Sequence, residues 1–321
     1  MIWALLFLIV GLFLLWRGAD FLVGGAVGLA ERMGVSQLVA GLTIVAMGTS
    51  APEVAAAIVA AVSGKGDIAI GNVYGSNIAN LALVGGVVAL IRPLEVRATT
   101  LRREIPAMLA TALLLWPALR DVTLSRADGF ALLLVFAGLV IYTVRTARGM
   151  GTAKPIEGLH VAIEPPRTVG RDVLYILLGL GALAVGAQAA VSGAVTIGSR
   201  IGLSDAVIGS TIIAVGTSLP ELVTCVVAAV KGHHDISVGN LVGSNIFNVL
   251  FVTGVAGLIH PFRVSARFAG GADFWVMIGV SVLFAAAALI GSRTIRRRSG
   301  VALLAIYAAY MVYLLRSTGS A

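Results

Sequence analysis

The chain has 321 residues, of which 59% are hydrophobic and 12% are charged, and its formal net charge is +8. Its mean hydropathy is +1.00. No soluble core needs so much apolar surface, so the composition excludes an ordinary soluble domain and predicts an integral membrane protein. The basic excess does not indicate a nucleic acid partner, because almost all Lys and Arg residues lie in short segments between apolar stretches.

Ten apolar stretches follow one another along the chain, and each comes close to the roughly 20 residues that a helix needs to cross a bilayer. The first stretch is too long for a cleaved signal peptide. The sequence therefore predicts an all-α integral membrane protein with ten transmembrane helices, five in each half, at residues 2–25, 37–62, 68–91, 104–119, 128–147, 172–198, 205–230, 236–260, 273–291 and 300–316.

The basic residues predict how these helices are oriented. If the loops alternate between the two sides, 15 Lys and Arg residues fall on one side and 7 on the other. Because basic loops stay in the cytoplasm, both termini are expected to be extracellular. The segment 148–171 contains Gly, Pro and charged residues and is then a cytoplasmic linker.

Residues 41–80 recur at residues 209–248 without a gap, and 23 of the 40 aligned positions are identical. The offset of 168 also relates Pro93 to Pro261. Because each copy contains five helices, an odd number, the second copy enters the membrane from the opposite side, as in secondary transporters that work by alternating access. The predicted domains are a first inverted repeat at 1–147, the linker, and a second inverted repeat at 172–321.

Each repeat carries one acid inside an apolar stretch, Glu53 in GTSAPE and Glu221 in GTSLPE. The preceding proline, Pro52 or Pro220, removes a backbone donor and is expected to break the helix. A break at membrane depth is tolerated where it is buried or lines a watery site. Intramembrane carboxylates are expensive and usually functional, although a purely structural pair of protonated acids is the alternative. Neighbouring hydroxyls add oxygen donors, at Thr49, Ser50, Thr217 and Ser218.

Oxygen donors of this kind suit calcium and sodium. Soft-metal chemistry is not expected, because the two segments contain no histidine, and the single cysteine, Cys225, is interpreted as a core residue without a role.

A second motif follows each acid, GNVYGSNIAN at 71–80 and GNLVGSNIFN at 239–248. Its serine and last asparagine are four residues apart and share one helical face, which can present oxygens toward the acids or serve only in helix packing. These residues are Ser76, Asn80, Ser244 and Asn248. The middle asparagines, Asn77 and Asn245, project elsewhere and are expected to bridge helices or hold the neighbouring break.

With G-T-S-x-P-E and G-S-N-I-x-N in both halves, the chain resembles the cation/calcium antiporter superfamily, and within it prokaryotic sodium/calcium exchangers related to potassium-dependent ones. The resemblance implies ten helices, gating helices at the start of each half, and a cation cluster at mid-membrane. By position, it implies a calcium site at Glu53, Glu221, Thr49 and Thr217. It implies flanking sodium sites and a centre at Ala46, Ser50, Ser76, Ala214, Ser218, Ser244, Asn80 and Asn248.

The chain departs from this pattern at one position. Potassium-dependent members have an aspartate where this chain has Asn248. The loss of that acid argues against potassium co-transport, leaves the sodium stoichiometry open, and strengthens the case for a proton as the partner ion.

Two carboxylates can neutralise one calcium ion or share the charge of several sodium ions, but not both loads at once in a low-dielectric site. We therefore expect an antiporter that exchanges sodium for calcium by alternating access at a mid-membrane, oxygen-lined site. A calcium/proton antiporter using the same two glutamates is the nearest alternative, and a cation channel is a more distant one.

The sequence does not predict an enzyme, because it has no Ser/His, paired-Asp or His-based metal constellation at membrane depth. No cofactor is expected, and the ligands are calcium, sodium and membrane lipid. The short loops indicate a multi-pass protein of a prokaryotic plasma (inner) membrane, with a monomeric transport unit.

Overall fold

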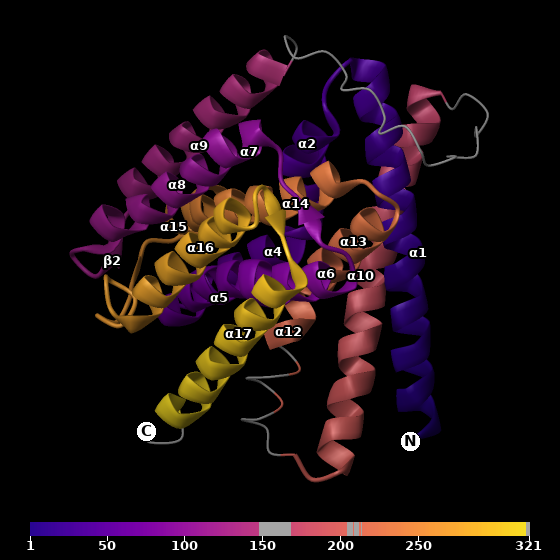
Figure 1. Ribbon diagram of the computed structural model, residues 1–321. Coiled ribbons are helices and arrows are strands. Elements are labelled where there is room, and N and C mark those ends of the chain that lie inside the picture. The colour runs from indigo at the N-terminus through magenta and orange to yellow at the C-terminus, as the bar shows by residue number, and fades with distance from the viewer. Residues whose placement is uncertain (148–167, 204–207, 209–211, 213, 319–321) are drawn as a thin grey trace.

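The computed structural model describes residues 1–147, 168–203, 208, 212 and 214–318, so most of the predicted linker 148–171 lies outside the described residues. The chain folds into helices joined by short turns and two small antiparallel ladders (Figure 1). The first half contains α1 (Ile2–Met33), α2 (Gln37–Ala40), η1 (Gly41–Val45), α3 (Ala46–Thr49), α4 (Ala51–Val62), α5 (Gly66–Ile78), η2 (Ala79–Val84), α6 (Gly85–Ile91), β1 (Leu94–Glu95), α7 (Ala98–Arg102), α8 (Glu104–Leu119), β2 (Thr123–Leu124) and α9 (Arg126–Ala147).

The second half repeats this order with nearly the same spacing. The segment α4 corresponds to α13 at the offset of 168, and β1 corresponds to β3 in the same way. Its elements are α10 (Val169–Arg200), α12 (Ala214–Thr217), α13 (Leu219–Val230), α14 (His234–Phe247), η4 (Asn248–Val252), α15 (Thr253–Ile259), β3 (Phe262–Arg263), α16 (Ala272–Ile290), β4 (Thr294–Ile295) and α17 (Arg297–Thr318).

Helix occupies the described part of every predicted apolar stretch. Among the described residues, seven helices are long and apolar enough to cross a membrane, and eight if the bent pair Gln37–Thr49 and Ala51–Val62 counts as one span. The helix α8 has only 16 residues, and the predicted stretch 205–230 lies partly outside the described residues. The count of ten spans stays a prediction.

The first helix extends past its predicted end at residue 25 and stops at Gly34, whose φ of 64° is the left-handed conformation that terminates helices. Its polar last turn is stabilised by the second half, because Arg32 Nε donates to Asp172 Oδ2 of α10 at 2.6 Å. Loss of hydrophobicity therefore marked the end of the apolar stretch but not the end of the helix.

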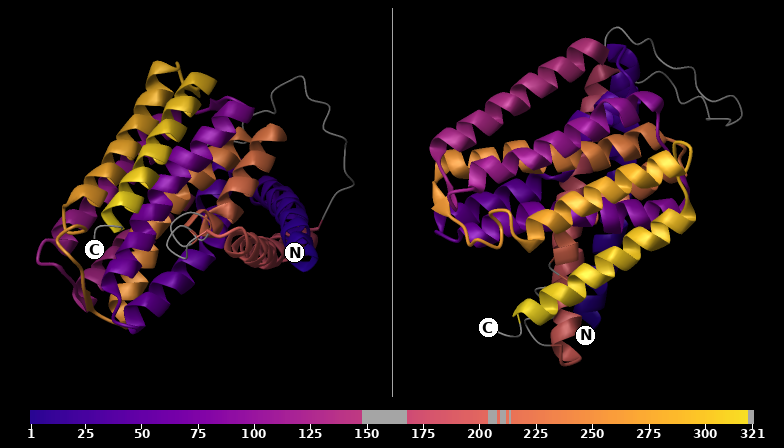
Figure 2. Two further views of the ribbon diagram at one scale, coloured as in Figure 1. Left: turned by 90° about the horizontal axis from the view of Figure 1, so that it is seen from below. Right: turned by 60° about the vertical axis from the view of Figure 1, so that its left-hand side comes forward.

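The helices α1 and α10 lie side by side and cross the remaining helices at a steep angle (Figures 1 and 2). Glycines seven residues apart on each helix face the partner's backbone. A Cβ atom built at Gly18 would lie 2.8 Å from the Gly179 carbonyl oxygen, and one at Gly186 would lie 2.8 Å from the Leu15 nitrogen. Only small residues allow two helices to approach so closely. The same seam includes Gly11, Gly25 and Gly193.

The other helices are tied together across the two halves. The strand β1 pairs with β4, with Leu94 opposite Ile295, and β2 pairs with β3, with Leu124 opposite Phe262. Each ladder therefore joins one strand of the first half to one of the second. The buried side chains form one large cluster in these helices and a separate cluster around α1 and α10.

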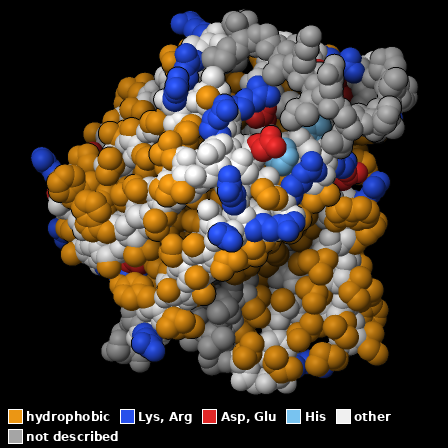
Figure 3. Space-filling model, viewed as in Figure 1, with side chains coloured by type: hydrophobic (Ala, Val, Ile, Leu, Met, Phe, Trp, Pro, Cys, Tyr) orange, Lys and Arg blue, Asp and Glu red, His pale blue; other side chains and the backbone are white. Residues whose placement is uncertain are grey.

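The turn between α13 and α14 contacts α1 and α2 at the start of the first half. The Lys231 ammonium pairs with the Asp20 carboxylate of α1, and His233 Nδ1 lies 3.1 Å from Gln37 Oε1 of α2. Burial and the nearby Lys231 charge lower the pKa of His233. On the molecular surface, Lys and Arg side chains gather in the upper part of the face shown in Figure 3, and hydrophobic side chains cover most of the rest.

The seam predicts the effect of adding a side chain to it. Gly18→Leu should lower the apparent melting temperature of the purified protein by about 2 to 10 °C, because overpacking of a close contact costs about 1 to 3 kcal/mol. Gly181→Leu is the matched control, since a Cβ atom at this α10 position meets nothing within 4 Å. Equal melting temperatures for the two variants would contradict the seam.

Candidate cation site

Both acids lie in the first turn of a helix that begins after a break. Ser50 has φ −86° and ψ 11° and separates α3 from α4, whose axes belong to a span bent by 46°. Ser218 has nearly the same conformation, φ −89° and ψ 5°, before α13. Pro52 and Pro220 lie in the first turn of the new helix, where a missing N–H is tolerated. The break that the prolines predicted is confirmed.

The two carboxyl groups are fully enclosed by protein. Glu53 is 0% exposed and Glu221 is 1% exposed. Each uses one oxygen for a hydroxyl donor: Ser76 Oγ donates to Glu53 Oε1 at 3.4 Å, and Ser50 Oγ donates to Glu221 Oε1 at 2.9 Å. The second oxygen of each, Oε2, has no hydrogen-bond partner in the described part of the chain. Two buried carboxylates are thus left half-satisfied, at a high cost in free energy.

The cluster contains side chains from both halves. Ser50 belongs to the first half and its acceptor, Glu221, belongs to the second. The Glu53 and Glu221 carboxyls are close enough to interact electrostatically. The structure therefore brings the two predicted motifs together around one place in the interior.

Further buried oxygens in the same motifs also lack partners among the described residues. A buried polar atom without a partner costs about 1 to 3 kcal/mol, and a bound cation would satisfy several oxygens at once. The unpartnered oxygens are Glu53 Oε2, Glu221 Oε2, Asn80 Oδ1, Asn245 Oδ1, Asn248 Oδ1 and Ser218 Oγ.

The other predicted residues occupy related positions with different contacts. Thr49 Oγ1 donates to Asn240 Oδ1 at 3.2 Å, and Ser244 Oγ donates to the same oxygen at 3.3 Å. Ala46 is fully buried in α3, one turn before Thr49. Thr217 lies in α12, at the position that corresponds to Thr49. The side chain of Ala214 lies outside the described residues.

Of the two middle asparagines, Asn77 bridges helices with its side chain, whereas Asn245 Nδ2 donates to the Leu241 carbonyl of its own helix. Asn77 Nδ2 donates to the Asn245 carbonyl at 3.4 Å, and Asn248 Nδ2 donates to Asn77 Oδ1 at 3.2 Å. These bonds join α5 to α14 and to the first residue of η4. Of the two roles predicted for Asn77, the bridge is the one observed.

The asparagine of each Gly-Asn dipeptide, Asn72 or Asn240, was not among the residues predicted from the sequence. Asn72 Nδ2 donates to the Glu53 carbonyl at 3.2 Å, and Asn240 accepts from Thr49 and Ser244. Their signal was present, because both are identical at the offset of 168 and precede the GSN motif. Turns of π-helix in η1, η2 and η4 are a second unpredicted feature, and such turns are frequent at functional sites.

The chemistry of this cluster is that of hard oxygen ligands. Among the described residues no group of three or more His, Cys, Asp or Glu side chains could hold a metal ion, so a transition-metal centre is not assembled there. Calcium takes 6 to 8 oxygens in a flexible shell of carboxylates, carbonyls and waters. Two carboxylates with amide and hydroxyl oxygens beside them fit such an ion.

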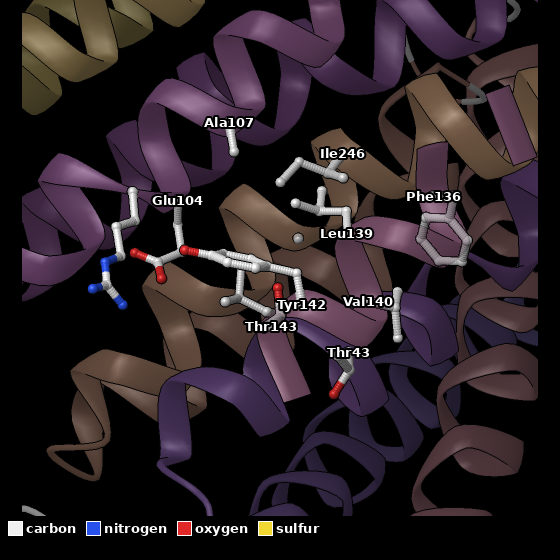
Figure 4. Close-up of a pocket in the computed structure, with 12 residues that line it drawn as sticks. Thr43, Glu104, Ala107, Phe136, Leu139, Val140, Tyr142, Thr143 and Ile246 are labelled. Carbon is white, nitrogen blue, oxygen red and sulfur yellow. The ribbon is translucent and has the colours of Figure 1, made fainter. Parts of the chain in front are cut away.

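A separate cavity of about 60 Å³ lies between α8, α9, η1 and α14 (Figure 4). Its wall is mostly apolar, with Phe136 toward one end and Glu104 toward the other. None of the twelve predicted cation ligands lines it. The cavity is therefore distinct from the buried oxygen cluster.

Comparison with known proteins gives one consistent result. The family model described as "Sodium/calcium exchanger protein" matches residues 3–145 and 172–316. CaxA of Alkalimonas amylolytica is 40% identical over 99% of this chain and 100% of CaxA. The sodium/calcium exchanger MaX1 of Methanosarcina acetivorans is 33% identical over 96% of this chain and 97% of MaX1.

Solved structures agree with these relatives. A structure of the sodium-calcium exchanger NCX_Mj has a TM-score of 0.81 and 31% identity to this chain, covering 96% of this chain and 97% of that one. The all-helical membrane fold is therefore shared, and the relatives are transporters rather than enzymes, with transported ions as substrates and no cofactor. This multi-pass membrane protein belongs to the sodium/calcium exchanger protein family.

Proposed function

We propose that this protein is an antiporter that exchanges sodium for calcium by alternating access at the buried oxygen cluster. The observation that carries the proposal is the pair Glu53 and Glu221, two enclosed carboxyls from equivalent positions of the two halves, each with one oxygen lacking a partner in the described chain. The family and the likeness to NCX_Mj support the same ions.

The charge of the cluster explains why exchange is coupled. One calcium ion cancels the charge of two carboxylates. Sodium ions spread over the neighbouring oxygens also compensate this charge, and two of them cancel it. The empty site leaves two carboxylates unneutralised in a low-dielectric interior, where like charges repel strongly. If the protein changes its accessible side only when the charge of the site is neutralised, it must carry either calcium or sodium at each change, so the two ions cross in opposite directions.

The residues proposed as ligands follow from this requirement. Those of the first half are Glu53, Thr49, Ser50, Ser76, Asn80 and Ala46, the last through its carbonyl. Those of the second half are Glu221, Thr217, Ser218, Ser244, Asn248 and Ala214, again through its carbonyl.

The helices α1 and α10 are the proposed moving unit. Their buried side chains lie in a cluster separate from the large one, together with a few residues of α2, η1, α13 and α14. Their seam is backbone against backbone, and the ladders of the described residues join other helices. The helix α10 also covers both breaks. A Cβ atom at Gly48 would lie 2.4 Å from Leu180 Cδ2, and one at Gly216 would lie 2.3 Å from Val191 Cγ2. Movement of α1 and α10 together across the other helices would uncover the carbonyls and hydroxyls beside each break.

The repeat implies what the opposite state looks like. If the two halves exchange roles, α1 covers the breaks in place of α10. At the offset of 168, Leu12 would then pack against Gly216 and Val23 against Gly48. Leu12 is 49% exposed in this structure, whereas Val23 is fully buried, so the movement would bury Leu12 and shift Val23 to a new partner.

The membrane arrangement is part of the proposal. It comprises ten spans in two inverted five-helix repeats, 1–147 and 172–321, joined by a cytoplasmic linker at 148–171, with both termini extracellular. The proposed setting is a prokaryotic plasma (inner) membrane, with a monomeric transport unit. The excess of basic residues in alternate loops supports this orientation.

A calcium/proton antiporter is the second candidate. The centre of the cluster carries Asn80 and Asn248 rather than further acids, so protonation of Glu53 and Glu221 alone would neutralise the site. Two protons would then replace the sodium load.

The glutamates can be tested in proteoliposomes. Glu53→Gln and Glu221→Gln should each reduce sodium-dependent calcium uptake by about 100-fold or more, because losing a charged ligand costs on the order of 3 kcal/mol. Radioactive calcium uptake into sodium-loaded vesicles, diluted into sodium-free buffer, measures this. Glu104→Gln, a carboxyl outside the cluster, should retain uptake. Activity in either motif variant would show that the site is elsewhere.

The partner ion can be tested with the same vesicles. An outward sodium gradient at clamped pH should drive calcium uptake, whereas a proton gradient without sodium should not. Uptake driven by protons alone would replace the sodium proposal with the calcium/proton one. Flux under neither gradient would mean that calcium is not the substrate.

The topology can be tested by thiol labelling. The single cysteine, Cys225, is 0% exposed, so the wild-type protein gives a low background. A membrane-impermeant maleimide should label Ser317→Cys in intact cells, and Lys154→Cys only after permeabilisation. The reverse pattern would invert the proposed orientation.

A further inference from the structure

The two halves differ in sequence one helical turn after each acid. Cys225, one turn after Glu221, corresponds to Ala57, one turn after Glu53. The neighbouring asparagines are identical, Asn240 and Asn72, yet their side-chain amides make different bonds. Asn72 donates to the Glu53 carbonyl, whereas Asn240 Nδ2 donates to Cys225 Sγ at 3.3 Å. One substitution between the repeats therefore coincides with a change in how the amide is held.

The thiol of Cys225 is held in a defined direction. Its S–H donates to the Ser237 carbonyl at 3.6 Å, so the sulfur presents a lone pair to the Asn240 amide. Cys225, Ser237 and Asn240 are all 0% exposed, which leaves no water to compete for these bonds. In the first half, the side chain of Ala57 has no atom that could accept a hydrogen bond.

The orientation of Asn240 places an acceptor beside two hydroxyl groups. With Nδ2 on the sulfur, Oδ1 accepts from Thr49 and Ser244, and the Thr49 hydroxyl has the Ala46 carbonyl at 3.4 Å as its other acceptor. A hydroxyl that ligates a cation must point its proton away from the ion. Asn240 supplies the acceptor for that proton, so the lone pairs of both hydroxyls remain for the cluster.

We propose that Cys225 and Asn240 form a positioning pair that holds the Thr49 and Ser244 hydroxyls ready for sodium. This inference rests on the proposed sodium/calcium exchange and names residues that set its sodium affinity. Sodium is more sensitive than calcium because its ligands here are neutral hydroxyls and carbonyls, whereas calcium binding is dominated by the two carboxylates. The pair lies in the second half and has no counterpart in the first, where the equivalent asparagine donates to the Glu53 carbonyl.

The test uses Cys225→Ala, which installs the residue of the first half. Without the sulfur, Asn240 loses the bond that fixes its amide. The sodium concentration for half-maximal calcium exchange should rise about fivefold, the equivalent of about 1 kcal/mol for one hydrogen bond. The calcium concentration for half-maximal uptake should change less than about twofold. Cys225→Ser, whose oxygen can accept the same bond, should restore the sodium dependence.

Ala57→Cys is the matched control in the first half. It changes an equally buried position, since Ala57 is 1% exposed, but Asn72 already donates elsewhere. Its sodium dependence should stay within about twofold of wild type. An equal loss in Ala57→Cys and Cys225→Ala would assign the effect to disturbed packing and overturn the inference.

A binding measurement separates this inference from the proposed function. Sodium should raise the melting temperature of the purified wild-type protein, because a ligand that binds the folded state stabilises it. The midpoint of this sodium titration should shift about fivefold in Cys225→Ala and return in Cys225→Ser. An unshifted midpoint, or an equal shift for calcium, would overturn the positioning role while wild-type exchange still stood. Absent sodium binding in wild type would overturn both.

Discussion

The structure depends on two carboxyl groups that the fold encloses without neutralising. A buried ionisable group normally has an oppositely charged partner or becomes neutral. Asp172 and Asp273 have such partners, Arg32 and Arg267. Glu53 and Glu221 receive only hydroxyl and backbone contacts from the described residues. Their missing partner is therefore expected to come from solution, and a partner that arrives and leaves is a substrate.

The helices beside the two acids are connected across the halves. An asparagine bridge joins α5 to α14, the helices that follow the acid-bearing α4 and α13, and the ladders pair β1 with β4 and β2 with β3. The helices α1 and α10 contact each other backbone against backbone through their glycines, and their buried side chains form a cluster separate from the large one. This division into two packed groups is the basis for proposing α1 and α10 as the part that moves.

Much of this arrangement could be predicted from the sequence because it is local or repeated. Pro52 and Pro220 predicted both breaks, and the offset of 168 paired the acids. The partners across the halves could not be predicted, since no sequence separation tells that Ser50 reaches Glu221 rather than Glu53. The role of Asn240 was missed because its contacts come from another helix and another half.

The two repeats align without a gap but are not identical, so the two halves of the protein are not fully symmetric. Duplication alone would give two equal halves and equal affinities on the two sides of the membrane. The chain departs from equality where it matters chemically: Cys225 stands opposite Ala57, and Asp20, which pairs with Lys231, corresponds to Gln188. The first difference reaches the hydroxyls of the cation cluster, and the second fastens α1 to the turn after α13. Small substitutions of this kind make the two halves of an almost symmetric fold chemically unequal, while Glu53 and Glu221 remain matched.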